Sequence, residues 1–217
     1  MTYDNCLNVG CGNKPIKGWI NIDNSPAIKL ASQPQLYRLF KTFGFLNENQ
    51  VQFIEWNKNN KIVFADISRE IPAPNDSIRI IYSSHMLEHL SCSDAEKFLV
   101  KSMEKLSHGG SIRLVVPDLK KIINEYLINP DADSFMENMM VSAPEINTLK
   151  QKISVLLRGY RHHQWMYDEN SLLKVLDKIG YKNVVSLKAG ETTIDHVGNL
   201  DLFERQENSL YVEAKKL

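Results

Sequence analysis

Two glycines that follow a short apolar run are the first residues of this chain whose type and spacing could do chemistry. Gly10 and Gly12 come directly after the run Cys6–Val9. Glycine lets the backbone turn sharply and lets a ligand approach the main chain. The Gly-x-Gly pattern therefore predicts a ligand-binding loop at the end of a strand. A tight turn that binds nothing is the alternative for these two residues taken alone.

The residues after this loop argue against a cofactor that contains a pyrophosphate. A dinucleotide-binding fingerprint has a third glycine, a crossover helix, and an acidic residue about 20 positions further on. Here Asn13–Ile16 replace the third glycine, and Asp23 already ends the next apolar run. We therefore expect S-adenosylmethionine, which has a ribose diol, an adenine and an amino acid tail but no pyrophosphate.

Two aspartates at the ends of later apolar runs supply acceptors for such a ligand. Asp23 can accept hydrogen bonds from both ribose hydroxyls, and Asp66 can accept one from the adenine amine. The alternative is that each carboxylate only caps a strand end or a turn. Because ligands of open parallel sheets bind beyond the carboxyl ends of the strands, we interpret both as cofactor-binding residues.

A histidine-rich stretch, His85–His89, follows the fourth apolar run and matches the pattern His-x-x-Glu-His. In inverted zinc proteases this pattern puts two histidines on one helix face, with Glu88 as general base. Its position just after a parallel strand argues against a protease. We favour the interpretation that Glu88 and His89 cap and pack the start of a helix.

A second pair of histidines lies in the loop 161–165, after a long insertion and before a helix. His162 and His163 are candidate catalytic residues, because a neutral imidazole is a suitable base for a hydroxyl group. A sulfonium methyl donor is already activated, so a weak base in the right position suffices. An exposed polar loop without a catalytic role is the alternative.

The elements that must position these residues alternate between short β-branched runs and helical patterns, which is typical of an α/β sheet. The predicted strands are Cys6–Val9, Trp19–Asp23, Ile62–Ala65, Ile78–Tyr82, Ile112–Val116, Asn183–Lys188 and Ser209–Ala214.

Two helices between these strands carry clear end signals. Ser93 and Glu96 predict a capping box for the first, and Gly109–Gly110 should end it. The second should run from Asp168 to Gly180. These helices and the strands predict a single domain over residues 1–217.

Two segments, about 27–60 and 119–160, are predicted helical insertions. In the first, Pro34 should begin a helix whose inward face is apolar and which Gly44 ends. The residues of that face are Leu36, Leu39, Phe40 and Phe43. In the second, helical spacing is seen at Ile146, Leu149, Ile153, Leu156 and Leu157.

Composition bounds the class of protein and its partners. The 217 residues contain 26 Lys plus Arg and 26 Asp plus Glu, so the formal net charge is zero. This balance lacks the net positive charge that is typical of nucleic-acid-binding proteins. The three cysteines, Cys6, Cys11 and Cys92, form no Cys-x-x-Cys pair and favour a reducing compartment. With no signal peptide or membrane span in the sequence, we expect a cytoplasmic protein.

Three motifs together resemble the class I S-adenosylmethionine-dependent methyltransferases, and more narrowly a bacterial group associated with surface polysaccharide biosynthesis. These motifs are Leu7–Lys14, Gly18–Asp23 and Ser83–Leu90, and Gly109–Gly110, Trp165–Asp168 and Ser209–Ala214 also match that group. The resemblance covers nearly the whole chain. It implies a Rossmann-like, three-layer α/β/α fold with a seven-stranded, mostly parallel sheet whose last strand is antiparallel.

The resemblance also implies roles for individual residues. Gly10 and Gly12 would hold the methionine moiety, Asp23 the ribose and Asp66 the adenine, while Ser83–His85 would line the methyl donor. The chain departs from the family at Asn8, where many class I enzymes have an acidic residue that holds the amino group. How Asn8 takes part in binding the amino acid tail is therefore open.

A further resemblance concerns metal binding. The small-RNA terminal 2′-O-methyltransferases have a similar Glu-x-x-Glu-His pattern with a distal histidine and bind a divalent cation there. His85, Glu88 and His89 stand at matching positions, and His162 or His163 would be the distal ligand. Such a cation would hold a vicinal diol, and a histidine at the first position favours softer metals over magnesium. Against this, we expect no metal and favour the capping role stated above.

The expected function is methyl transfer from S-adenosylmethionine to a hydroxyl of a small molecule, with His85, His162 and His163 as candidate catalytic residues. The resemblance implies a saccharide or nucleotide sugar as the acceptor, and a homodimer is possible. The alternatives are an N- or carboxyl-methyltransferase of another metabolite, and a cofactor-binding module without turnover.

Overall fold

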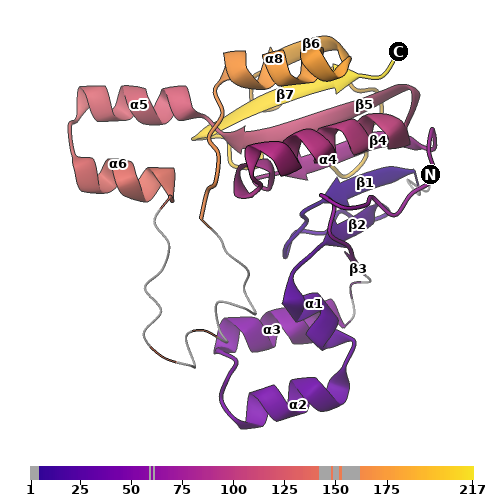
Figure 1. The fold of residues 1–217 in the computed structure, drawn as a ribbon, viewed down its shortest axis with the longest axis vertical. Helices are drawn as coiled ribbons and strands as arrows, with labels where there is room; N and C mark the ends of the chain where they lie inside the picture. The colour runs from indigo at the N-terminus through magenta and orange to yellow at the C-terminus, as the bar shows by residue number, and fades with distance from the viewer. Residues whose placement is uncertain (1–4, 59, 61, 142–147, 149–151, 153–161) are drawn as a thin grey trace.

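Residues 5–58, 60, 62–141, 148, 152 and 162–217 are described by a computed structural model of the chain, in which one sheet forms the centre (Figure 1). Its strands are β1 (Cys6–Val9), β2 (Ile20–Asp23), β3 (Val63–Phe64), β4 (Ile78–Ser84), β5 (Leu106–Pro117), β6 (Lys182–Leu187) and β7 (Ser209–Lys215). The order across the sheet is β3-β2-β1-β4-β5-β7-β6.

The strand directions confirm the expected topology. Strands β2, β1, β4 and β5 pair in parallel, and β3 pairs in parallel with β2. Strand β7 runs antiparallel to both β5 and β6. Chain order reverses between β1 and β4, so ligands are expected at the carboxyl ends of these two strands. The glycine loop after β1 and the histidine-rich stretch after β4 both lie there.

The helices flank the sheet at its faces and ends. They are α1 (Pro26–Ala31), α2 (Pro34–Thr42), α3 (Glu48–Asn57), the 3-10 helix η1 (Leu87–His89), α4 (Cys92–Lys105), α5 (Leu119–Ile128), α6 (Ala132–Met139) and α8 (Glu169–Ile179). No helix among the described residues is long and apolar enough to cross a membrane.

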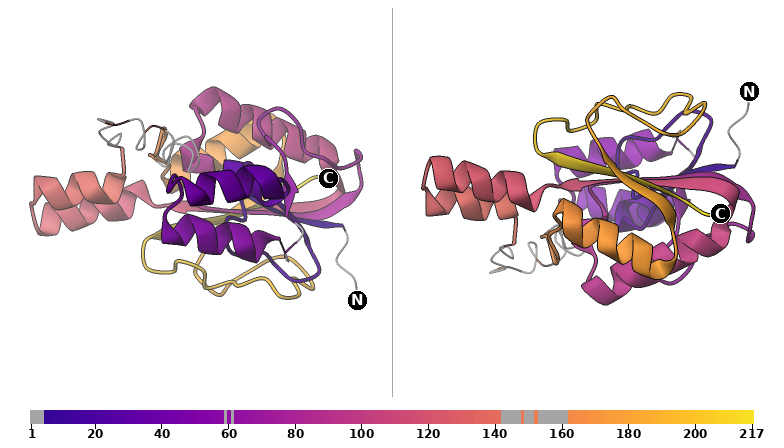
Figure 2. Two further views of the ribbon diagram at one scale, coloured as in Figure 1. Left: turned by 90° about the horizontal axis from the view of Figure 1, so that it is seen from below. Right: turned by 90° about the horizontal axis from the view of Figure 1, so that it is seen from above.

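The two faces of the sheet are covered differently. On one face, Phe98 and Leu99 of α4 and Leu172 and Leu176 of α8 are completely buried in the main core. On the other face, Trp19, Ile194 and Leu200 belong to the segments that precede β2 and β7 and pack on Tyr82. Figure 2 shows the sheet nearly edge-on, with α4 and α8 on one side and the connection from β6 to β7 on the other.

The end signals of α8 are confirmed, and those of α4 are not. Asp168 and Ser171 form a reciprocal capping box at the start of α8, and Gly180 ends it in the left-handed conformation. The N-cap of α4 is Ser91 rather than Ser93: its side chain accepts a hydrogen bond from the Asp94 amide. The helix therefore begins two residues earlier than predicted, at Cys92.

The end of α4 was also predicted too late in the chain. The helix ends at Lys105, and Gly109–Gly110 lie inside β5, where the register against β4 is irregular. Gly110 is needed there because a Cβ would stand 2.8 Å from the Ser107 carbonyl oxygen and 2.9 Å from that of Ile78. These glycines therefore permit a strand irregularity and do not end the helix.

The helical content expected at 27–60 and 119–160 is present in the described parts of both segments. In the first, however, the apolar face of α2 was predicted only in part: Phe40 packs against the cluster that contains the buried Tyr37. Leu36, Leu39 and Phe43 are instead 39%, 51% and 66% exposed. In the second, α5 and α6 form a hairpin that extends past the carboxyl end of β5 (Figure 1). The spacing from Ile146 to Leu157 lies outside the described residues.

Candidate functional site

The glycine loop is held against β2 by its own backbone. The Gly10 and Cys11 amides both donate to the Ile22 carbonyl oxygen, at 2.8 and 3.1 Å. The Gly12 amide donates to Oδ2 of Asp23 at 2.9 Å. Three successive amides of the loop are therefore satisfied within the chain, so hydrogen bonds to β2 and Asp23 hold the conformation of the loop.

The two glycines are required for different reasons. Gly10 has a φ of +70°, and a Cβ there would stand 2.5 Å from Cγ and 2.7 Å from Cβ of Met86. Gly12 has a φ of +50°, and a Cβ there would meet no atom within 4 Å. Gly10 thus lets the loop pack on the residue after His85, whereas Gly12 borders open space where a ligand can reach the backbone.

Asn8 acts as a brace for this loop. Its Nδ2 donates to the Lys14 carbonyl oxygen at 3.0 Å and to Oδ1 of Asn21 at 2.9 Å. Asn21 in turn binds both the amide and the carbonyl oxygen of Ile16. A neutral amide fits here because both partners of Asn8 are acceptors, which a carboxylate could not satisfy.

The two aspartates lie at the expected strand ends. Oδ1 of Asp23 accepts from the Ser25 amide at 2.7 Å, so each oxygen of this carboxylate has one backbone donor and one further lone-pair site. Asp66 follows β3, and its side chain is 42% exposed. Its Oδ1 accepts from the Ser68 amide and hydroxyl, at 3.2 and 2.7 Å. Both carboxylates therefore retain acceptor capacity for a ribose and an adenine.

The end of β4 forms a sharp corner. Ser83 is buried, Ser84 is half-buried, and His85 has a φ of +49°, in the left-handed region that non-glycine residues rarely adopt. Nε2 of His85 lies 2.8 Å from Oγ of Ser209 on β7. Because η1 covers only Leu87–His89, His85 and His89 do not share an α-helical face. The chain therefore does not have the pair of histidines on one helix face that an inverted zinc protease requires.

A cluster of three side chains lies next to the corner at the end of β4. Glu88, His89 and His163 each offer one ligating atom, and these atoms all lie within 4.8 Å of one another. Oε1 of Glu88 lies 3.5 Å from Nδ1 of His85 and 3.9 Å from Nε2 of His163. Glu88 is 1% exposed, and neither carboxylate oxygen has a hydrogen-bond partner among the described residues.

Backbone hydrogen bonds bring His163 to this cluster. The Glu88 carbonyl oxygen accepts from the amides of Gln164 and Trp165, at 2.8 and 3.2 Å. The side-chain amide of Gln164 donates to the His89 carbonyl oxygen at 2.7 Å, and the His163 amide donates to that of Met140 at 2.8 Å. These bonds fix the second pair of histidines against η1.

Burial controls the protonation of the cluster. It lowers the pKa of His85 to about 3 and that of His163 to about 4, with smaller contributions from neighbouring positive groups. It raises the pKa of Glu88 to about 7. In each case the charged form loses hydration inside the protein. Both imidazoles are therefore neutral at physiological pH.

A cavity of about 670 Å³ opens beside the cluster. Its wall includes His85, Glu88, His89 and His163 on one side and Phe203, Arg205 and Ser209 on another. His162 is not among the described residues that line it; the His162 carbonyl oxygen instead lies 3.2 Å from Nδ1 of His89. Two of the three histidines proposed from the sequence as catalytic thus reach this cavity.

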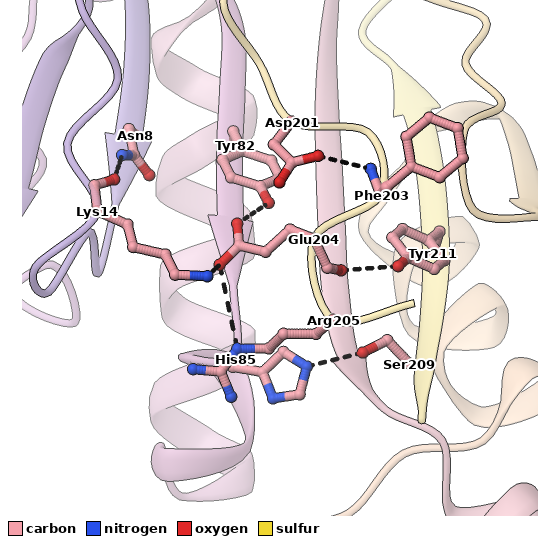
Figure 3. A network of polar contacts seen from close by, with 10 residues as sticks. All are labelled: Asn8, Lys14, Tyr82, His85, Asp201, Phe203, Glu204, Arg205, Ser209 and Tyr211. Atoms are coloured by element: carbon pink, nitrogen blue, oxygen red, sulfur yellow. Dashed lines mark hydrogen bonds and ion pairs between the residues drawn. The ribbon is translucent and has the colours of Figure 1, made fainter. Parts of the chain in front are cut away.

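The far wall of the cavity, which Phe203 and Arg205 help to form, is held in place by Glu204 (Figure 3). Sequence reasoning missed Glu204. Its carboxylate accepts from the Tyr82 hydroxyl at 2.7 Å and from Nζ of Lys14 at 3.1 Å. Its carbonyl oxygen accepts from the Tyr211 hydroxyl at 2.7 Å. One residue therefore ties the connection between β6 and β7 to β4 and to the glycine loop. No local sequence signal marks Glu204, because its partners are far apart in the chain.

The fold has counterparts among solved structures. A S-adenosylmethionine-dependent methyltransferase from Archaeoglobus fulgidus is 16% identical, with a TM-score of 0.50 over 97% of this chain and 85% of that one. One from Thermotoga maritima, a possible histamine N-methyltransferase, is 10% identical, with a TM-score of 0.53 over 98% and 82%. The chain has the class I methyltransferase fold. No protein-family model and no curated protein sequence matches it.

Proposed function

We propose that this protein is a S-adenosylmethionine-dependent methyltransferase that methylates a hydroxyl of a sugar or sugar-like small molecule. The observation that carries the proposal is the packing of Gly10 on Met86. Met86 follows His85, which lines the cavity, so the glycine loop and the cavity both lie next to residues 85–86. A donor bound at the loop and an acceptor bound in the cavity would meet at this corner.

The donor side offers a chemically suitable set of residues. The open space at Gly12 admits a ligand to the loop, and the Asp23 carboxylate beside it has lone pairs left for a ribose diol. Asp66 would accept the adenine amine. Asn8 would act through the loop that it braces, and Ser83, Ser84 and His85 would border the sulfonium methyl group.

The acceptor side can bind a hydroxyl and receive its proton. In the transfer, the acceptor oxygen bonds to the methyl carbon, the bond from carbon to sulfur breaks, and the sulfonium becomes a thioether. The hydroxyl proton must leave, and His85 and His163 present neutral imidazoles to the cavity. We assign the catalytic role to these two residues; His162 would act only through its contact with His89.

The saccharide class of acceptor rests on the motif resemblance and on the size of the cavity. Small-molecule sites span about 300–1,000 Å³, and this cavity of about 670 Å³ suits a sugar unit with a substituent. A saccharide or nucleotide sugar of surface polysaccharide biosynthesis is the acceptor we propose, within the cytoplasm. We also propose a single cooperative domain, which would unfold in one transition in urea.

Two measurements test the proposal in order. Calorimetry with S-adenosylhomocysteine should give one bound ligand per chain, and a screen of nucleotide sugars and saccharides should release S-adenosylhomocysteine with at least one acceptor. Absence of cofactor binding would overturn the proposal. Binding with turnover only on amines or carboxylates would reassign the acceptor. Binding without turnover on any acceptor class would indicate a cofactor-binding module.

A further inference from the structure

We infer that Glu88, His89 and His163 form a binding site for one divalent transition-metal ion of the zinc type. These residues come from η1 and from the loop before α8, 75 positions apart along the chain. Their ligating atoms lie within 4.8 Å of one another. The inference concerns the ion alone; only its role in the reaction rests on the proposed function.

The strongest support is the condition of Glu88. A buried carboxylate without a hydrogen bond is costly, because the protein removes its hydration and returns nothing. Glu88 is 1% exposed, and both of its oxygens are without a hydrogen-bond partner in the part of the chain that the structure describes. A cation at this position would supply the missing partner and would make the buried charge favourable.

The tautomer of His89 and the position of His163 suit the same ion. The contact of 3.2 Å from Nδ1 of His89 to the His162 carbonyl oxygen requires a proton on Nδ1, which in the neutral ring makes Nε2 the unprotonated nitrogen. Such a bond from a ligating histidine to a carbonyl oxygen is typical of metal sites, where it fixes the tautomer and the ring orientation. His163 is 6% exposed, and its Nε2 lies 3.9 Å from Oε1 of Glu88, so its imidazole lies within reach of the same ion.

The geometry selects three ligands and leaves His85 out. Nε2 of His85 is engaged with Ser209 and Nδ1 lies 3.5 Å from Glu88, so this ring orients the carboxylate. Two imidazoles and one carboxylate bind zinc at about 2.0–2.2 Å and leave a fourth position open. Side-chain rotations that move the three ligating atoms by about 1 Å would bring them to those distances from the ion.

The open position suits the proposed reaction. All three ligands line the cavity in which the acceptor would bind. With the ion bound, His163 would be a ligand and not a base, so His85 alone would receive the proton of an acceptor hydroxyl that the ion positions and acidifies. Magnesium fits this donor set poorly, because it prefers oxygen ligands to nitrogen.

The test uses the untagged full-length chain, stripped with a chelator and titrated with Zn²⁺ and Co²⁺. We expect one ion per chain by elemental analysis, a rise in melting temperature, and visible absorption of the Co²⁺ form that reports tetrahedral or five-coordinate geometry. Glu88→Gln and His163→Ala should each weaken Zn²⁺ binding by at least 100-fold, whereas His85→Ala should weaken it by less than tenfold. The control, His108→Ala, removes an exposed imidazole on β5 and should leave binding unchanged.

Wild-type protein that binds less than half an equivalent of either ion would overturn the inference, as would variants of Glu88 and His163 that bind like the control. Circular dichroism of each variant separates lost binding from lost folding, and Glu88→Asp gives a second, charge-preserving variant, expected to bind in between. Calorimetry with S-adenosylhomocysteine on the metal-free protein separates the two proposals. Cofactor binding without metal binding would refute only the metal site, and metal binding without cofactor binding would refute only the proposed function.

Discussion

The glycine loop and the cluster of Glu88, His89 and His163 lie beyond neighbouring strands, yet their polar groups are satisfied to very different degrees. In the loop, three successive amides have acceptors on β2 or Asp23. In the cluster, a buried carboxylate has no hydrogen bond among the described residues. The polar groups of the loop are thus satisfied within the chain, whereas the cluster contains a buried carboxyl group whose ionised form is unfavourable.

The loop and the cluster therefore contribute differently to the stability of the fold and to ligand binding. A satisfied loop stabilises the fold and offers its ligand a fixed surface, so binding there costs little ordering. An unsatisfied buried group costs stability and persists where function requires it. Variants in the loop should therefore lose both stability and cofactor binding, whereas variants in the cluster should lose function and can gain stability.

The largest effect is expected for Gly10→Val. The side chain would overlap Met86 and occupy a left-handed conformation, which together should cost about 4 kcal/mol of unfolding free energy and abolish cofactor binding. Gly12→Ala is the matched control, because its Cβ meets open space and should cost only about 1 kcal/mol while still weakening the cofactor. Urea denaturation and calorimetry measure both. Equal stability losses would contradict the distinct roles of the two glycines.

His163→Ala should separate turnover from cofactor binding. Loss of a group that binds or deprotonates the acceptor lowers kcat by about 100-fold or more. Affinity for S-adenosylhomocysteine should stay within about twofold, because His163 lines the cavity and not the glycine loop. His196→Ala, at an exposed position outside the cavity wall, is the control. Unchanged turnover of His163→Ala would remove this residue from the mechanism.

Asp23→Asn should act mainly on the cofactor. A hydrogen bond to a charged group contributes about 1.5–3 kcal/mol, so the dissociation constant should rise about 10- to 100-fold. The Gly12 amide would also lose its charged acceptor, and we expect a stability loss of about 1 kcal/mol. Asp66→Asn, at a carboxylate whose side chain is 42% exposed, should raise the dissociation constant by only about threefold. The reverse order of the two effects would place the ribose elsewhere.

The smallest effect, and the one of opposite sign, is expected for Glu88→Met. Replacing a buried carboxylate without a hydrogen bond by an apolar side chain of similar length should raise the unfolding free energy of the metal-free protein by about 1 kcal/mol. Turnover should be lost at the same time. A destabilised but folded Glu88→Met would show that the carboxylate is satisfied in solution, and would remove the contrast with the loop.

Much of the fold was predictable because its signals are local. Each β-branched run became a strand, and the alternation with helices implied a mostly parallel sheet. The cap of α8 was read correctly from Asp168 and Gly180. One error arose where two local signals competed, because Ser91 and Ser93 both offer a cap and Ser91 is the one used. Another arose because Gly109–Gly110, which also suit a helix end, lie inside β5.

The sequence by itself determined the strands, the glycine turn and the aspartates at the strand ends, since these depend on backbone preferences and on the alternation of apolar residues along short segments. Only the tertiary structure decided that Glu88 lies beside His163, and that Glu204 joins the far wall to the glycine loop. The physical reason is that such contacts form between residues far apart in the chain, where packing and backbone hydrogen bonds of the whole fold, rather than neighbouring residues, set which side chains meet.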